Sequence, residues 1–227
     1  MTPLFSPLIE RAIELAAEWH DQTYRKSRWR EHPFEPPPQT VLRIPVMAHL
    51  TAVALTVQRA GWDDETVAAA FLHDALEDEN QFEDAMTARS LAILVGEDVV
   101  ERVRGVTEPK RGPDDDYLPW RVRKETYVDT LHGASAEAAA ISLADKLHNV
   151  WTMNQALAEG IDIFSDAPPR RGLSAGPAEQ LWFFHAVLDA SETHDDPRLE
   201  PMRERLREEV ERFKQLATGD GEQAVLS

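Results

Sequence analysis

The sequence contains no cysteine, so neither a disulfide nor a thiolate metal site can form within its 227 residues. Long hydrophobic runs are also missing, since no stretch approaches the roughly 18 apolar residues that a membrane-spanning helix needs. The first residues have neither the charged start nor the apolar stretch of a secretory signal peptide. These absences favour a cytoplasmic protein that is not inserted in a membrane.

Basic residues are scarce: 24 lysines and arginines stand against 41 acidic residues, which gives a formal net charge of −17. A field of this sign repels DNA, RNA and anionic lipid surfaces, so general nucleic-acid binding is not expected. A small phosphorylated substrate stays possible where a metal ion and local cations offset the field. Two local basic groups, in residues 25–30 and 121–124, can do this or can simply be solvated faces.

Apolar side chains recur every three to four residues through most of the chain, and this spacing predicts α-helices. No segment shows the alternating pattern of a strand. The predicted fold class is therefore all-α, a compact multi-helix bundle long enough for one sizeable core. Prolines in residues 27–43 predict an extended loop there, and residues 161–176 predict another. The expected helices span residues 7–20, 45–60, 64–78, 87–95, 97–105, 119–132, 136–159, 177–190 and a charged last helix at 198–217.

The most informative segment is 70–79, which reads Ala-Phe-Leu-His-Asp-Ala-Leu-Glu-Asp-Glu. Apolar residues lead into His73 and Asp74, and a second doublet, Glu77 and Asp78, follows four residues later. Residues four apart share a helix face, so a helix through this segment would stack the second doublet on the first. Such a group near a core is costly unless a positive charge lies within it. A divalent metal ion is the obvious candidate.

Two other predicted helices each carry one polar residue on an apolar face: His49 and Asp145. Taken alone, His49 is interpreted as a satisfied core histidine and Asp145 as a buried contact between helices. Together with the histidine and aspartate of the first doublet, they make a set of two imidazoles and two carboxylates. This set suits Mn²⁺, Fe²⁺, Zn²⁺ or Mg²⁺, and it leaves positions open for water and a phosphate oxygen.

The order of these residues resembles the HD phosphohydrolase superfamily. More narrowly, it resembles the hydrolase domain of the RelA/SpoT-type bifunctional alarmone synthetase/hydrolases and their small stand-alone relatives. The similar stretches together span about residues 8–155, and two of them are extended motifs. These stretches are 20–22 with 25–26, then His49, 71–78, 104–107 and 143–149.

The resemblance implies a single metal-dependent hydrolase domain over residues 1–227, with its core at about 6–190 and no room for a synthetase or regulatory domain. The implied reaction is hydrolysis of guanosine 3′,5′-bis(diphosphate), or of the pentaphosphate, to pyrophosphate and GDP or GTP, usually with Mn²⁺. The implied metal ligands are His49, His73, Asp74 and Asp145. The residues implied to orient or deprotonate the attacking water are Glu77 and Asp78. The implied nucleotide contacts are Arg25, Lys26, Asn149 and Thr152.

Three departures from the family pattern lie around the expected nucleotide pocket. The loop 27–43 replaces a short Gly-x-Pro-Tyr segment, Leu50 stands where proline is usual, and Trp151 stands where arginine is usual. An HD phosphohydrolase for another nucleotide or phosphorylated cofactor therefore stays an alternative. A non-catalytic nucleotide-sensing module is a lower alternative, because it predicts a lost ligand or a lost Glu-Asp pair. The sequence leaves the oligomeric state and the identity of the metal open.

Overall fold

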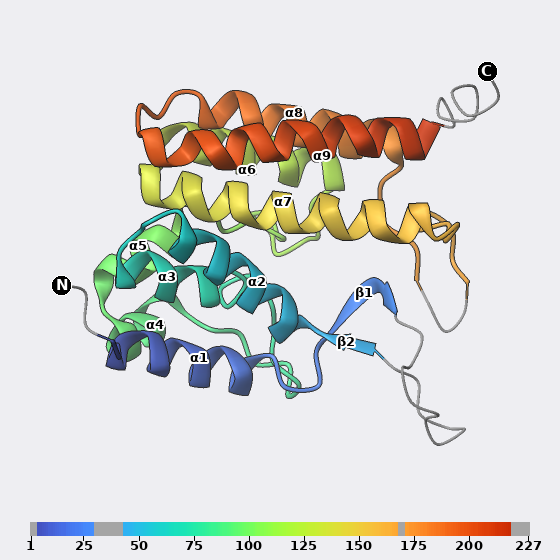
Figure 1. The fold of residues 1–227 in the computed structure, drawn as a ribbon. Coiled ribbons are helices and arrows are strands. Elements are labelled where there is room, and N and C mark those ends of the chain that lie inside the picture. Colours follow the sequence, from blue (N-terminus) through green and yellow to red (C-terminus); the bar gives the residue numbers. More distant parts are fainter. Residues whose placement is uncertain (1–3, 30–42, 168–170, 219–227) are drawn as a thin grey trace.

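The computed structural model describes residues 4–29, 43–167 and 171–218, and nine α-helices occur in these ranges (Figure 1). This confirms the all-α prediction. A short 3₁₀ turn, Pro197–Leu199, precedes the last helix. The helices are α1 (Pro7–Trp19), α2 (Val46–Arg59), α3 (Asp64–Phe71), α4 (Ala88–Val95), α5 (Glu97–Arg104), α6 (Trp120–Gly133), α7 (Ala136–Ala158), α8 (Pro177–Ser191) and α9 (Glu200–Thr218).

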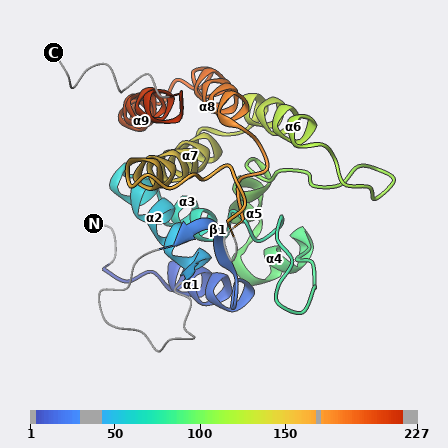
Figure 2. The ribbon, with the colours of Figure 1, turned by 90° about the vertical axis from the view of Figure 1, so that its right-hand side faces the viewer.

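The long helix α7 separates two layers of shorter helices. In Figure 1, α6, α8 and α9 lie above α7, and α1 to α5 lie below it; Figure 2 shows the same order from the side. α7 packs against α2, α3 and α5 in one layer and against α8 and α9 in the other. Its buried alanines, Ala138, Ala139, Ala140 and Ala144, allow neighbouring helices to approach closely. A polar residue in the middle of α7 therefore lies between the two layers.

The charged last helix presents one apolar face to this core. Leu206, Val210 and Phe213 of α9 are buried, and the ring of Phe213 lies 5.9 Å from that of Phe184 in α8. None of the helices in the described ranges is long and apolar enough to cross a membrane.

Capping residues set the bounds of several helices. The side chain of Ser6 accepts a hydrogen bond from the N–H of Ile9 at the start of α1, and Asp63 accepts one from Thr66 at the start of α3. α7 ends next to Gly160, which has a φ of +74° that favours glycine. Eight of the nine predicted helices begin and end within two residues of the observed bounds.

The predicted helix 64–78 is wrong in its second half. α3 ends at Phe71, and residues 72–77 form successive turns that end in a bend at Asp78. The carbonyl oxygen of Ala70 accepts a 2.8 Å hydrogen bond from Nδ1 of His73. In a continuing helix that carbonyl would instead accept from the backbone N–H of Asp74. The two doublets, 73–74 and 77–78, are therefore not stacked on one α-helical face as predicted.

A two-stranded antiparallel ribbon was not predicted. It consists of β1 (Tyr24–Trp29) and β2 (Arg43–Pro45), with Tyr24 opposite Pro45. The predicted loop 27–43 therefore begins and ends in strands, and its residues 30–42 lie outside the described ranges. β2 leads directly into α2, so the ribbon holds β1 beside the start of that helix (Figure 1).

Candidate metal centre and surrounding charges

The turn after α3 fixes the tautomer of a neutral His73 ring. Because Nδ1 donates to the carbonyl of Ala70, a neutral His73 ring carries its lone pair on Nε2. Nε2 is buried, has no hydrogen-bond partner among the described residues, and lies 3.3 Å from Oδ1 of Asp74. A lone pair that faces a carboxylate oxygen is unfavourable unless a cation lies between them. This orphaned nitrogen therefore fits a metal ligand.

His49 of α2 and Asp145 of α7 complete the cluster from the other side. His49 is buried, and its Nε2 lies 3.1 Å from Oδ1 of Asp145. The same oxygen lies 3.9 Å from Nε2 of His73. His49, His73 and Asp74 each offer a ligand atom within 4.8 Å of the other two. The four predicted ligands are thus brought together, and their nitrogen and oxygen donors suit a divalent transition metal.

Asp145 is a charged group in a buried position. Its Oδ2 pairs with Nζ of Lys146, and its Oδ1 accepts a 2.5 Å hydrogen bond from Nδ2 of Asn149. Burial alone would raise the pKa of Asp145, but the charge of Lys146 and the hydrogen bond from His49 hold that pKa well below its usual range. For His49, burial and then the charge of Arg25 lower the pKa well below its usual value. At neutral pH a neutral imidazole therefore faces an ionised carboxylate.

Glu77 and Asp78 differ in their surroundings. Oε1 of Glu77 accepts a 2.7 Å hydrogen bond from the backbone N–H of Glu108. Burial and the negative charge of Asp74 raise the pKa of Glu77 to about 8. The carboxylate of Asp78 is instead paired with Lys110. Both side chains line a hollow of about 560 Å³, so both lie at a surface that a substrate or water can reach.

The predicted nucleotide contacts are only partly assembled around this cluster. Nη2 of Arg25, from β1, donates a 2.6 Å hydrogen bond to Oδ1 of Asn149, which in turn contacts Asp145. Thr152 is buried and donates to the backbone carbonyl of Asn149 at 2.8 Å. The side chain of Lys26 lies outside the described side chains. Arg25 and Asn149 therefore reach the ligand cluster, while Thr152 supports the backbone beside it.

Lys146 is a functional neighbour that the sequence reasoning missed. It is buried, pairs with Asp145, and its Nζ lies 4.6 Å from the ring centre of Tyr127 and 5.4 Å from that of Phe183. The charge of Asp145 outweighs the effect of burial and raises the pKa of Lys146. A lysine beside Asp145 in the core-facing segment 141–147 was the available signal, because a buried lysine needs a partner.

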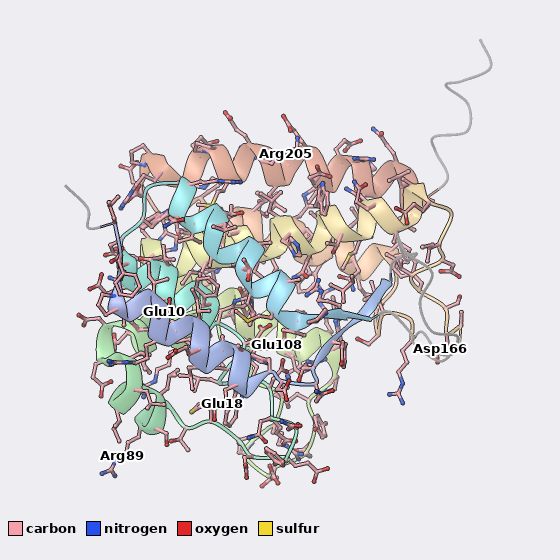
Figure 3. The ribbon with its side chains drawn as sticks, turned by 60° about the horizontal axis from the view of Figure 1, so that its bottom comes forward. Glu10, Glu18, Arg89, Glu108, Asp166 and Arg205 are labelled. Atoms are coloured by element: carbon pink, nitrogen blue, oxygen red, sulfur yellow. The ribbon has the colours of Figure 1, made fainter. Side chains whose placement is uncertain are left out.

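Glu108 was also missed, and it links the loop after α5 to α6. Its buried carboxylate pairs with both Arg123 and Lys124, while its backbone N–H holds Glu77. Figure 3 shows Glu108 toward the middle of the molecule, whereas Arg89 lies at its edge. The resembling stretch 104–107 ends one residue before Glu108, and no local pattern distinguishes Glu108 from other acidic residues.

Two further histidines lie close to the cluster. Nδ1 of His148 lies 2.7 Å from Nδ1 of His49. His20 is buried, and both its ring nitrogens have no hydrogen-bond partner among the described residues. Burial lowers the pKa of His20, although the charges of Asp74 and Asp78 act in the opposite direction. Both histidines belong to stretches that carry the family resemblance, but neither had been given a role.

The chain is similar to known proteins in both sequence and fold. Residues 38–166 match the HD domain family. The guanosine-3′,5′-bis(diphosphate) 3′-pyrophosphohydrolase MESH1 of Xenopus tropicalis is 32% identical over 155 residues, 67% of this chain and 73% of that protein. The MESH1 of Danio rerio is 33% identical over 118 residues, 51% of this chain and 59% of that protein. A solved structure, described as a metazoan orthologue of SpoT that hydrolyses ppGpp, has a TM-score of 0.64 and 24% identity over 95% of this chain and 99% of that one, a likeness of fold.

Proposed function

The chain belongs to the HD-domain family, and we propose that it hydrolyses guanosine 3′,5′-bis(diphosphate), or its pentaphosphate form, to pyrophosphate and GDP or GTP. The observation that carries the proposal is the convergence of two imidazole nitrogens and two carboxylates beside Glu77. Relatives that are 32% and 33% identical bear the name of this reaction. The chain spans 73% and 59% of those relatives.

The ligand set implies a divalent metal ion, and we take Mn²⁺ as the first candidate, with Fe²⁺, Zn²⁺ and Mg²⁺ as alternatives. His49 and His73 would bind through Nε2, and Asp74 and Asp145 through carboxylate oxygens. Bound there, such an ion lowers the pKa of a water molecule and offsets negative charge on a phosphate.

The acidic pair would handle the proton of the attacking water. The oxygen of water attacks the phosphorus that is attached to the 3′ oxygen, and the bond from that phosphorus to the 3′ oxygen breaks. The water loses a proton to a carboxylate, and the 3′ oxygen gains one as the nucleotide leaves. Glu77 is the better acceptor, because its raised pKa makes it the stronger base, a bound cation would bring that pKa toward neutral so that the carboxylate is ionised, and the N–H of Glu108 holds one of its oxygens in place. Asp78 has its charge already offset by Lys110 and would orient the water.

Arg25 is the described cation best placed to neutralise phosphate charge. β1 brings it to Asn149, one contact away from Asp145. A guanidinium group can bind two phosphate oxygens at once, and a local cation is needed in a chain of net charge −17.

Hydrolysis of the tetraphosphate by the purified protein tests the proposal. The protein is incubated with Mn²⁺ and guanosine tetraphosphate, and GDP and pyrophosphate are separated and quantified. We expect Glu77→Gln to lose a factor of about 10² to 10⁴ in rate. Glu79→Gln is the matched control, because Glu79 is an exposed glutamate only two residues further along the chain. No turnover with Mn²⁺, Fe²⁺, Zn²⁺ or Mg²⁺ would overturn the proposal.

A second candidate is hydrolysis of another nucleotide or phosphorylated cofactor. Trp151, which stands where the family usually has arginine, is 39% exposed, and its ring lies 6.3 Å from that of His148. An exposed indole beside the cluster favours stacking on a base over pairing with a phosphate. Release of phosphate or pyrophosphate from a panel of nucleotides separates the two candidates, because only one class should show saturable turnover.

A further inference from the structure

We propose that His148 is a positioning residue that fixes the tautomer of His49 and thereby sets the affinity of the metal centre. The inference rests on the proposed function, because it concerns how one of the proposed ligands is held. The Nδ1 atoms of the two rings are 2.7 Å apart, and the ring centres are 4.8 Å apart with an interplanar angle of 42°. This is hydrogen-bonding distance between two ring nitrogens.

Only one proton can lie between the two Nδ1 atoms. Two lone pairs would repel one another at this distance, and so would two N–H groups. The other nitrogen of His49, Nε2, lies 3.1 Å from Oδ1 of Asp145 and is the atom that faces the ligand cluster. A nitrogen that binds a metal is unprotonated, so a neutral His49 must then carry its proton on Nδ1 and donate it to His148.

His148, which accepts from His49, differs from the carbonyl of Ala70, which accepts from the other proposed histidine ligand, His73. His73 donates its Nδ1 proton to the carbonyl of Ala70, and a carbonyl oxygen can only accept. An imidazole can accept or donate. His148 can therefore serve the metal-bound ring as an acceptor and the metal-free ring as a donor.

The metal-free and the metal-bound pair of rings, His49 and His148, carry the same number of protons. Without metal, Nε2 of His49 donates to Asp145, and Nδ1 of His49 accepts from Nδ1 of His148. With metal, His49 loses the Nε2 proton and takes the shared proton on Nδ1, while His148 gains a proton on Nε2. Both rings stay neutral, so the buried site does not have to accommodate an extra positive charge when the ligand tautomer forms.

The test compares metal binding by three variants. His148→Phe keeps a ring but removes the acceptor, and His148→Gln restores a group that can accept or donate. His185→Phe is the matched control, because His185 is exposed on α8. We expect Mn²⁺ affinity, measured by calorimetry with a competing chelator, to fall about 10- to 100-fold in His148→Phe. It should stay within a few-fold of wild type in His148→Gln and be unchanged in His185→Phe.

A second measurement on the wild type decides the case if His148→Phe does not fold. In Zn²⁺-loaded protein with ¹⁵N-labelled histidine, we expect a proton on Nδ1 of His49 and none on Nδ1 of His148. A proton on Nδ1 of His148, or wild-type affinity in a folded His148→Phe, overturns the inference and leaves the proposed function intact. A wild-type protein that binds no divalent metal overturns both.

Discussion

Substitution of Glu77 by glutamine should change how the stability of the metal-free protein depends on pH. Burial and the charge of Asp74 raise the pKa of Glu77 from its ordinary 4.5 to about 8. A raised pKa means that the folded state favours the protonated form. The contribution of Glu77 to stability is therefore complete below about pH 4.5 and is lost as the pH rises toward 8. Glutamine imitates the protonated form and keeps an oxygen for the N–H of Glu108.

The expected size of the effect follows from the pKa. Each unit of pKa difference corresponds to about 1.4 kcal/mol, so between pH 4.5 and 7 the carboxylate costs at most about 3 kcal/mol. Glu77 retains some contact with solvent, which screens the charge and reduces this value. We expect Glu77→Gln to be more stable than wild type by about 1 to 2 kcal/mol at pH 7. The gain should vanish near pH 4.5.

Urea unfolding with a chelator, at pH values from 5 to 8.5, measures the free energy of unfolding of both proteins. The difference between them should grow with pH and level off above about pH 8. The exposed control Glu79→Gln should show no such trend. A difference that is constant over this range, or a variant less stable than wild type at pH 8, would refute the reasoning. Added Mn²⁺ should shrink the difference, because a nearby positive charge lowers the pKa of Glu77.

Three other substitutions test the charges around the centre. Lys146→Met leaves the buried carboxylate of Asp145 without its partner. The free energy of unfolding, measured by urea titration, should fall by about 3 to 5 kcal/mol. An unchanged free energy would contradict the buried ion pair. Arg25→Ala removes a cation that is expected to contact the substrate. Steady-state kinetics should therefore show a KM raised about tenfold or more and a smaller change in kcat. The exposed control Arg89→Ala should leave both constants unchanged. His20→Leu removes a buried ring whose two nitrogens have no hydrogen-bond partner among the described residues. Calorimetry should therefore show that the metal-free variant is more stable than the metal-free wild type by about 1 kcal/mol. A less stable variant would mean that the His20 ring has a partner, such as an ordered water.

The helices were predictable because the information that specifies them is local. Apolar spacing, capping residues such as Ser6 and Asp63, and the glycine after α7 lie within a few residues of each boundary. The helix 64–78 failed because a side chain, His73, captures a backbone carbonyl and ends α3 early. The spacing of apolar residues gives no sign that a side chain will compete with the backbone for a carbonyl oxygen.

The residues of the site likewise fall into those that the sequence predicts and those that it does not. The ligands could be proposed because their order along the chain matches a family, although the stacked geometry first used to group them was wrong. Of the groups that set the charge of the site, Lys146 adjoins Asp145 in the sequence and left a local signal, whereas Glu108 and His148 contact residues far away along the chain and could not be predicted locally. Glu108 reaches Glu77 across 31 residues, and His148 reaches His49 across 99. Tertiary packing brings these groups together: His148 lies in α7, which packs on α2, and Glu108 follows α5, which packs on α3.

The arrangement of charges also indicates why this site needs a divalent ion before it can hold an anionic substrate. Two lysines at the site, Lys146 and Lys110, are already paired with Asp145 and Asp78. They therefore hold carboxylates in place and contribute little positive charge to an incoming phosphate. The imidazole of His49 is neutral and adds no positive charge to the carboxylates of the metal-free cluster, which lies within a chain of net charge −17. A divalent ion reverses the sign of the field at that one point, so metal binding should precede nucleotide binding.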